Sequence, residues 1–232
     1  MTHKIHAPVI ITAHTNADFD CLSSMVAARK IYPEGTLVFP GSQEQSLRDF
    51  FIQSATYLFN FYSMKDIDQD SVHTVIVCDT RQPSRLAHLA HLLQRPDLTL
   101  YAFDHHPDSG EDLVTAFQDV RPWGSTVAIL TDIIRSREIS LSADEATIMG
   151  LGLYEDTGCF TFSSTTEHDL LALWWLKTKG MDIGFIADFL NRELSAEQVS
   201  ILNNLLEAAT NHTINGLELC ISAISLDNYV RD

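Results

Sequence analysis

Four short clusters of acidic and histidine residues carry the side chains of this sequence that could perform chemistry. The clusters are His14–Asp20, Asp79, Asp104–His106 and Glu155–Gly158. In the first cluster, residues 14, 16, 18 and 20 are polar and alternate with threonine, alanine and phenylalanine. An extended backbone would direct these four polar side chains to one side.

Several aspartates with a few histidines and no cysteine favour a hard divalent cation, Mn²⁺ or Mg²⁺, over a structural zinc ion. Two such ions, about 3.5–4 Å apart and bridged by a shared carboxylate, can activate a water and hold a phosphoryl oxygen for in-line attack. Two divalent ions would offset the −4 charge of four aspartates, which are Asp18, Asp20, Asp79 and Asp156. Because these carboxylates repel one another without metal, metal binding should stabilise the fold.

Apolar runs predict the elements that must position these clusters. Four buried strands are expected, at Pro8–Ala13, Thr36–Phe39, Thr74–Cys78 and Leu98–Phe103. Helical patterns at residues 22–31 and 42–61 alternate with the first strands, which predicts an α/β fold with a doubly wound, mostly parallel sheet and helices on both faces. Three clusters directly follow strands. They should converge on one crevice, because ligands of such sheets bind outside the carboxyl ends of the strands.

The second half of the sequence is predicted to be mostly helical. Helices are expected at residues 124–139, from the capping box at 142–145 onward, at 166–180, and at 195–211 after a second capping box. Residues 216–224 then have the pattern of a strand, and the few residues after it supply no partner strand. We therefore expect this sequence to be a fragment of a longer protein.

The clusters together resemble the four motifs of the DHH phosphoesterase family. The match comprises His14-x-Asn16-x-Asp18-x-Asp20, the strand-ending Asp79, Asp104-His105-His106 and Asp156-Thr157-Gly158, in the family's order across residues 8–165. Segments 38–44, 47–51 and 160–166 more particularly resemble the N-terminal module of large bacterial proteins that join DHH, CBS and tRNA nucleotidyltransferase/poly(A) polymerase-type domains. This second resemblance covers nearly the whole chain.

The resemblance implies a ligand set for two Mn²⁺ ions, with Mg²⁺ as the alternative. One ion would be held by His14, Asp18 and Asp79. The other would be held by Asp20, Asp79, His105 and Asp156. Asp79 would bridge the two ions and would be one of two catalytic residues.

The other catalytic residue would be His106, which is expected to face the substrate phosphate, while Asp104 would orient a ligand histidine. Asn16 matches an asparagine of class II inorganic pyrophosphatases. Arg81 follows Asp79 closely and could bind phosphate, or it could pair with surface carboxylates of an acidic protein. Ser125 opens a helix whose N-terminus could attract an anion, or it could simply cap that helix.

Two departures from the family pattern qualify this interpretation. The usual Pro-Asp-Gly-Asp or Pro-Asp-Thr-Asp core is replaced by Ala17-Asp18-Phe19-Asp20, which keeps both carboxylates but introduces a bulky Phe19. The Gly-rich, His-containing substrate motif of the family's second domain is absent from the sequence. We therefore expect a DHH-type metal-binding phosphoesterase domain at residues 1–190, a linker helix at 191–212 and the truncated start of a C-terminal substrate-binding lobe at 213–232.

Composition restricts the class of protein. The chain has 232 residues, and 15 Lys+Arg against 31 Asp+Glu give 15 − 31 = −16, which excludes a free-standing binder of nucleic acid driven by charge. No apolar run is long enough for a membrane span, and no signal peptide is recognised. The four cysteines are far apart and form no CxxC pair, so reduced thiols in a cytoplasmic protein are expected.

The sequence supports three functional hypotheses. The first is an Mn²⁺-dependent phosphoesterase that hydrolyses phosphodiester or phosphoanhydride bonds of short oligonucleotides or small nucleotides, weak or inactive as this fragment. The second is a non-catalytic, metal- and nucleotide-binding regulatory module of a tRNA nucleotidyltransferase-type protein. The third, suggested by Asn16, is a class II inorganic pyrophosphatase. Expected partners are a small phosphorylated substrate or short oligonucleotide and further C-terminal domains of the same chain. No association with a membrane is expected, and the sequence leaves open whether the protein forms oligomers.

Overall fold

The computed structural model describes residues 4–41, 60–190 and 196–225 of the chain. It divides into two compact units, Met1–Asp188 and Phe189–Asp232, which are described separately. Among the described residues, no helix is long and apolar enough to cross a membrane.

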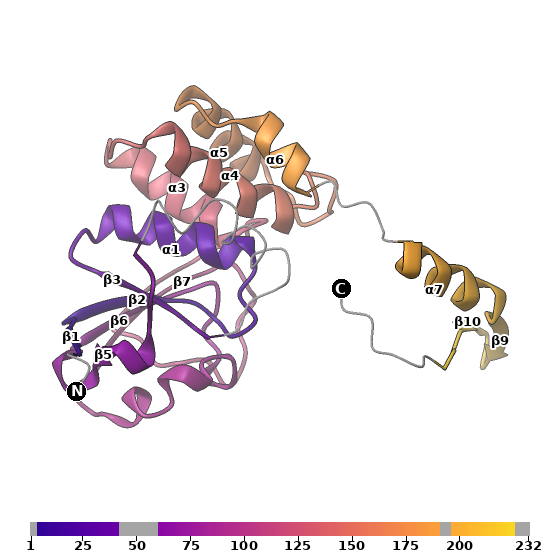
Figure 1. The fold of residues 1–232 in the computed structure, drawn as a ribbon, viewed down its shortest axis with the longest axis horizontal. Coiled ribbons are helices and arrows are strands. Elements are labelled where there is room, and N and C mark those ends of the chain that lie inside the picture. The colour runs from indigo at the N-terminus through magenta and orange to yellow at the C-terminus, as the bar shows by residue number, and fades with distance from the viewer. Residues whose placement is uncertain (1–3, 42–59, 191–195, 226–232) are drawn as a thin grey trace. The chain divides into compact units, whose positions relative to one another are not determined.

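The first unit is built on a six-stranded, wholly parallel sheet in the order β4-β3-β2-β6-β7-β8 (Figure 1). Its strands are β2 (Val9–Thr12), β3 (Thr36–Phe39), β4 (Tyr62–Ser63), β6 (Thr74–Cys78), β7 (Thr99–Asp104) and β8 (Phe117–Val120). From β2 the chain moves outward through β3 to β4, then returns to the other side of β2 and continues outward through β7 to β8. The reversal falls between β2 and β6, and this is the point where a doubly wound sheet opens a crevice for ligands.

The helices lie in a layer above one face of this sheet. Helix α1 (Phe19–Ile31) packs on β2, β3 and β6, and helices α3 (Thr126–Ser136) and α4 (Ala143–Asp156) pack against α1. Helix α5 (Glu167–Thr178) contacts α3 and α4, and α6 (Ile183–Leu190) follows it along the chain (Figure 1). Helix α1 is therefore the central helix of the unit, which explains why ten of its residues are buried.

The opposite face of the sheet is covered by short 3₁₀ turns between Met64 and Gln94 and by the two-residue parallel pair of β1 (Ile5–His6) and β5 (Ile67–Asp68). The core on this side joins Ile10, Val75 and Val77 of the sheet to Leu86 and Leu89 of the turns. Apolar residues of β6 are thus buried on both faces, as its unbroken apolar run predicts.

The expected α/β fold with a parallel sheet is confirmed, although among the described residues the long helices cover one face and short 3₁₀ turns cover the other, where helices on both faces were expected. Further differences occur at particular elements. The helix predicted at 42–61 falls mainly on residues 42–59, outside the described residues, and its last two residues are irregular and directly precede the short strand β4. Helix α3 begins at Thr126 rather than 124, because Ser125 is its N-cap and accepts a hydrogen bond from the amide of Ala128. Strand β8 was not predicted, because Phe117 and Gln118 are exposed at the edge of the sheet and give no buried apolar run.

The second unit contains α7 (Ala196–Glu207) and an antiparallel hairpin of β9 (Thr210–Ile214) and β10 (Leu217–Ile221). The prediction that the last strand lacks a partner was wrong, because β9 pairs with β10 along its whole length. The predicted helix to residue 211 ends at Glu207. Asn215 and Gly216 form the two-residue turn with φ of 52° and 83°, a conformation for which Asn-Gly is the favoured sequence.

Candidate metal centre

The four polar clusters meet at the carboxyl edge of the sheet. His14 and Asp18 follow β2, Asp79 directly follows β6, and His105 directly follows β7. Asp156 is the last residue of α4, which reaches the same edge because α4 packs along α1. The convergence expected from the sequence is therefore present.

His14, Asp18 and Asp79 form one group of potential ligands. Nε2 of His14 lies 3.2 Å from Oδ2 of Asp79 and 3.7 Å from Oδ2 of Asp18. Nδ1 of His14 donates a hydrogen bond to the carbonyl oxygen of Thr15 at 2.7 Å, which leaves Nε2 with its lone pair toward the carboxylates. The histidine side chain is 3% exposed, and Nε2 has no hydrogen-bond partner among the described residues.

A second group comprises Asp20, His105 and Asp156, and a third comprises Asp79, His105 and His106. Nε2 of His105 lies 3.1 Å from Oδ2 of Asp156 and 3.5 Å from Oδ1 of Asp79. Nδ1 of His105 donates to the carbonyl oxygen of Trp123 at 3.1 Å, so its Nε2 also points at carboxylates. Asp79 belongs to the first and third groups, one oxygen toward each histidine, which is the geometry that a bridging ligand requires.

Asp20 connects α1 to the start of α3. Its two carboxylate oxygens accept hydrogen bonds from the amides of Thr126 and Val127, at 2.8 and 2.9 Å. These amides are unpaired donors of the first turn of α3, where negative charge is favoured. The side chain is thereby fixed in the interior of the site, and Thr126 adds a hydroxyl that donates to Oδ1 of Asp79 at 2.9 Å.

The pKa values of the carboxyls report their crowding. Burial raises the pKa of Asp79, but the neighbouring His14, His105 and His106 outweigh burial and lower this pKa to about 2. Burial and the charge of Asp79 raise the pKa of Asp156 to about 8, and the same two causes raise the pKa values of Asp18 and Asp20. Asp79 thus favours its charged form, while the three neighbouring aspartates resist ionisation beside it. A bound cation would offset the repulsion among these carboxylates.

The donor set fits divalent cations. Imidazole nitrogens and carboxylate oxygens suit Mn²⁺, and the buried atoms His14 Nε2 and Asp156 Oδ2 have no hydrogen-bond partner among the described residues. Buried polar atoms nearly always have a partner, and where the protein supplies none, a water or an ion usually does. These residues therefore form candidate metal sites of the kind the sequence predicts.

His106 lies at the exposed rim of the centre, and the buried Asp104 holds it there. Oδ1 of Asp104 accepts a hydrogen bond from Nδ1 of His106 at 2.8 Å, and this bond raises the pKa of His106. The side chain of His106 is 42% exposed. Asp104 thus orients a histidine as predicted, but this histidine is His106 rather than the predicted metal ligand His105.

The structure brings neither Arg81 nor Ser125 to an open surface. The side chain of Arg81 is 3% exposed and donates to Asp104 Oδ2, Asp108 Oδ1 and the carbonyl oxygen of His106, at 3.0, 2.7 and 2.7 Å. Of the two alternatives drawn from the sequence, pairing with carboxylates is what the geometry favours. Ser125 is buried, and its hydroxyl accepts from Ala128 as an ordinary N-cap.

Asn16 is exposed at the outer side of the first cluster, with a φ of 59°. Arg85 lies near His106, whose pKa its positive charge opposes, and among the described residues no carboxylate forms an ion pair with it. Its carbonyl oxygen accepts from both the amide and the hydroxyl of Thr15, which fixes the segment beside the first cluster.

Sequence reasoning missed two members of the centre. The hydroxyl of Thr126 was not predicted to take part. Its role depends on the contact between the start of α3 and the end of β6, and the spacing of residues in the sequence does not indicate this contact. Cys21 was left outside the clusters, which were expected to hold no cysteine. The structure instead places the Cys21 thiol with His14, Asp18 and Asp79, where all four potential ligand atoms lie within 4.8 Å of one another.

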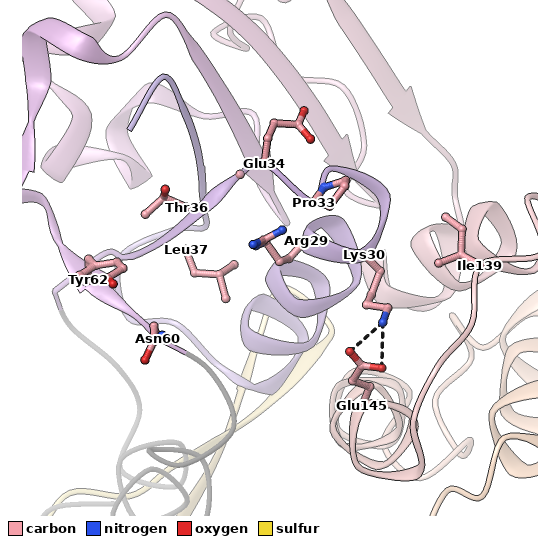
Figure 2. A pocket seen from close by; sticks show the side chains of 11 residues that line it. Arg29, Lys30, Pro33, Glu34, Thr36, Leu37, Asn60, Tyr62, Ile139 and Glu145 are labelled. Atoms are coloured by element: carbon pink, nitrogen blue, oxygen red, sulfur yellow. Dashed lines mark hydrogen bonds and ion pairs between the residues drawn. The ribbon is translucent and has the colours of Figure 1, made fainter. Parts of the chain in front are cut away.

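Two cavities adjoin the sheet at different places. A cavity of about 420 Å³ beside His105 and His106 is also lined by Pro107, Asp108, Gln118, Val120 and Pro122, and it offers space for a substrate next to the centre. A larger cavity of about 620 Å³ lies at the start of β3 and the end of α1 (Figure 2). Its charged lining includes Arg29 and the ion pair between Lys30 and Glu145, and it contains none of the clustered ligands.

Residues 8–153 match the sequence profile of the DHH family, N-terminal domain. The chain belongs to the DHH family. Among relatives, the A-adding tRNA nucleotidyltransferase of Geobacter sulfurreducens is 41% identical over 96% of this chain, and the match covers 25% of that protein. The chain thus spans about a quarter of this relative's length.

The bifunctional oligoribonuclease and PAP phosphatase NrnA of Bacillus subtilis is 25% identical over 73% of this chain and 52% of its own. A solved structure of an exopolyphosphatase-related protein from Bacteroides fragilis has the same fold, with a TM-score of 0.67 and 16% identity over 88% of this chain and 62% of that one. Of the four motifs identified in the sequence, the first three lie within residues 8–153, and the fourth, Asp156-Thr157-Gly158, comes just after the matched range.

Proposed function

We propose that this DHH domain is an Mn²⁺-dependent phosphoesterase that hydrolyses phosphodiester or phosphoanhydride bonds of short oligonucleotides or small nucleotides. The observation that carries the proposal is the position of Asp79, whose two oxygens face separate histidines in two groups of ligands. The name of the NrnA relative supports short oligoribonucleotides and PAP as the substrate class.

In this proposal His14, Asp18 and Asp79 hold one ion. The second ion is held by Asp20, Asp79, His105 and Asp156. Two such ions supply a nucleophilic water of lowered pKa and offset charge on the phosphoryl oxygens. The amides of α3 and the carbonyls of Thr15 and Trp123 keep the ligands in place, so little reorganisation is needed.

His106 is the proposed contact to the substrate phosphate. Asp104 holds Nδ1 and favours the protonated ring, which leaves the exposed side of the imidazole to donate to a phosphate oxygen. Arg85 is a better second phosphate contact than Arg81, because Arg81 is buried among carboxylates and Arg85 is not paired with any in the described part of the chain. The cavity beside His106 would receive the rest of the substrate.

The organisation of the whole protein is also a proposal. The hairpin of β9 and β10 exposes Ile214, Leu217, Leu219 and Ile221, and the relatives extend far beyond the matched region. We infer that residues 213–232 begin a lobe that contributes to substrate binding. Hydrolysis by the 232-residue chain should accordingly be weak.

A second candidate is a regulatory module that binds metal and nucleotide without turnover. The 41% identical relative favours it, because that protein is named for nucleotide addition and this region is only a quarter of it. The complete ligand set counts against it, since a site that only binds has no need of a bridging carboxylate.

A substrate panel with Mn²⁺ tests the proposal. Short oligoribonucleotides, phosphoadenosine phosphate, pyrophosphate and cyclic dinucleotides would be offered to the wild-type chain, to Asp79→Asn and to the exposed control Asp70→Asn. We expect hydrolysis of the first two, lost without metal and in Asp79→Asn but kept in the control. Hydrolysis that survives in Asp79→Asn would overturn the proposal, and saturable nucleotide binding without product would favour the regulatory module.

A further inference from the structure

Cys21 is the fourth side chain around the space enclosed by His14, Asp18 and Asp79. Its Sγ lies 3.5 Å from Oδ2 of Asp79, and its thiol is completely buried. Cys21 is the third residue of α1, and its amide donates to Oδ1 of the N-cap Asp18 at 2.9 Å. The first turn of α1 thus fixes both Asp18 and the thiol toward the same space.

A second observation indicates that this space receives a ligand. Nε2 of His14 is buried, has no hydrogen-bond partner in the described residues, and points between the two carboxylates that flank Cys21. Cys78 is equally buried and directly precedes Asp79 in the sequence, but it belongs to none of the three ligand groups. Burial near an aspartate therefore does not by itself place a thiol among ligands.

We propose that this position is a mixed nitrogen, oxygen and sulfur site, in which Cys21 coordinates thiophilic divalent ions such as Zn²⁺ or Co²⁺ together with His14, Asp18 and Asp79. The inference rests on the metal centre of the proposed function and adds a residue to it. One histidine, one thiolate and two carboxylates supply four ligands, and four is the coordination number that Zn²⁺ prefers.

The chemistry distinguishes hard from soft ions. When a thiophilic ion binds, its bond to Sγ replaces the S–H bond and the proton leaves to the solvent. Mn²⁺ prefers oxygen and nitrogen, so the thiol keeps its proton and its hydrogen bond to Asp79. The group of Asp20, His105 and Asp156 contains no sulfur, so the two positions would differ in metal preference.

The test uses the 232-residue chain with the exposed thiols removed by Cys159→Ser and Cys220→Ser. Co²⁺ titration should give a sulfur-to-metal charge-transfer band that saturates at one ion per chain. Adding Cys21→Ser should abolish the band and weaken Zn²⁺ binding by at least about tenfold, while Mn²⁺ binding is nearly unchanged. Adding Cys78→Ser instead should preserve the band.

X-ray absorption of the Zn²⁺-loaded parent gives a reading that does not depend on the folding of any Cys21 variant. One sulfur at about 2.3 Å from zinc is expected. A shell of nitrogen and oxygen alone, or a charge-transfer band that persists in Cys21→Ser, would overturn the inference. If Mn²⁺ binds and no sulfur ligates Zn²⁺, only this inference fails, whereas failure of the chain to bind any divalent ion removes the proposed function as well.

Discussion

Asp79 reaches the centre of the site through a backbone conformation that few residues adopt. Its φ is 61°, in the left-handed region that aspartate tolerates better than most residues, and its amide still donates to the carbonyl of Phe103 at 2.9 Å. The chain therefore turns sharply just where β6 ends, and the carboxylate faces both histidines. The sequence predicts that Asp79 is a ligand, but not this local conformation.

Replacing Asp79 by asparagine keeps the shape and the tolerated φ but removes the shared charge. The wild-type chain should gain about 2.7 kcal/mol in free energy of unfolding when free Mn²⁺ is 100 times the dissociation constant of one site. Asp79→Asn should gain less than half of this at the same concentration. Denaturant unfolding with and without Mn²⁺ measures both gains. If the exposed control Asp70→Asn loses as much of the Mn²⁺-dependent gain as Asp79→Asn does, the role of Asp79 as a shared ligand is contradicted.

Arg81 tests the difference between a structural and a substrate-binding arginine. Arg81→Met removes the guanidinium partner of the buried Asp104 Oδ2 and leaves only His106 paired with this carboxylate, so it should destabilise the fold by about 3–5 kcal/mol. The matched change Arg95→Met removes the solvent-screened pair with Asp97 and a hydrogen bond to the carbonyl oxygen of Gln69, and it should destabilise the fold far less than Arg81→Met. An Arg81→Met variant of normal stability with weakened substrate binding would instead restore the phosphate-binding interpretation.

His88 gives the fold an acid dependence of its own. Burial lowers the pKa of His88 to about 4, and its Nε2 is 2.8 Å from the hydroxyl of Thr12. In the unfolded state the pKa of His88 is about 6.5, so below this pH the unfolded state binds more protons than the folded state. The contribution of neutral His88 to the free energy of unfolding is therefore present above pH 6.5 and is lost as the pH falls toward 4, by up to about 3 kcal/mol. His88→Gln should flatten the fall in stability over this interval. Unfolding at several pH values measures it, and the exposed control His91→Gln should follow the wild type.

At the scale of elements, the sequence predicts those parts whose reason is local. The run Thr74–Cys78 is a strand with these bounds because every residue is apolar or β-branched, and the capping box at Ser142 begins α4 as expected. Strand β9 is polar except for Ile214, and all its residues are exposed, so no burial pattern predicts it, although Asn215-Gly216 was an available signal for the hairpin. The bond from Asp20 to the start of α3 could not be predicted, since 106 residues separate the partners.

The contact between α1 and α4 depends on Gly152. A Cβ at this position would lie 2.7 Å from the carbonyl oxygen of Phe19 and 2.7 Å from Oγ of Ser23, and the backbone oxygen cannot move aside. Gly152→Ala should therefore destabilise the fold by about 1–3 kcal/mol, although alanine is ordinarily the better helix former. Gly110→Ala, where a Cβ meets nothing within 4 Å, is the control. Thermal and denaturant unfolding measure both variants, and equal stability of the two would contradict this packing argument.

At the scale of the whole molecule, the net charge of −16 has little to do with the metal centre. Two divalent ions would change it only to −16 + 4 = −12, so most of the acidity belongs to the ordinary surface. Under the proposed function, attraction of a polyanionic substrate would therefore come from the bound ions, from His106 and Arg85, and from the proposed C-terminal lobe. The overall acidity thus excludes charge-driven nucleic-acid binding by this chain and is compatible with the proposed phosphate-binding site, which is a local feature.

The two units should differ in what they contribute to stability. In residues 197–225 no described side chain is buried, and apolar residues of α7 such as Leu202 and Leu206 are exposed. The core and every proposed metal ligand lie before residue 189. A chain ending at Leu190 should consequently keep the melting temperature and the Mn²⁺ affinity of the 232-residue chain, because the truncation removes little buried apolar surface. Calorimetry and metal titration on both lengths decide this, and a truncated chain that melts several degrees lower would contradict the expectation.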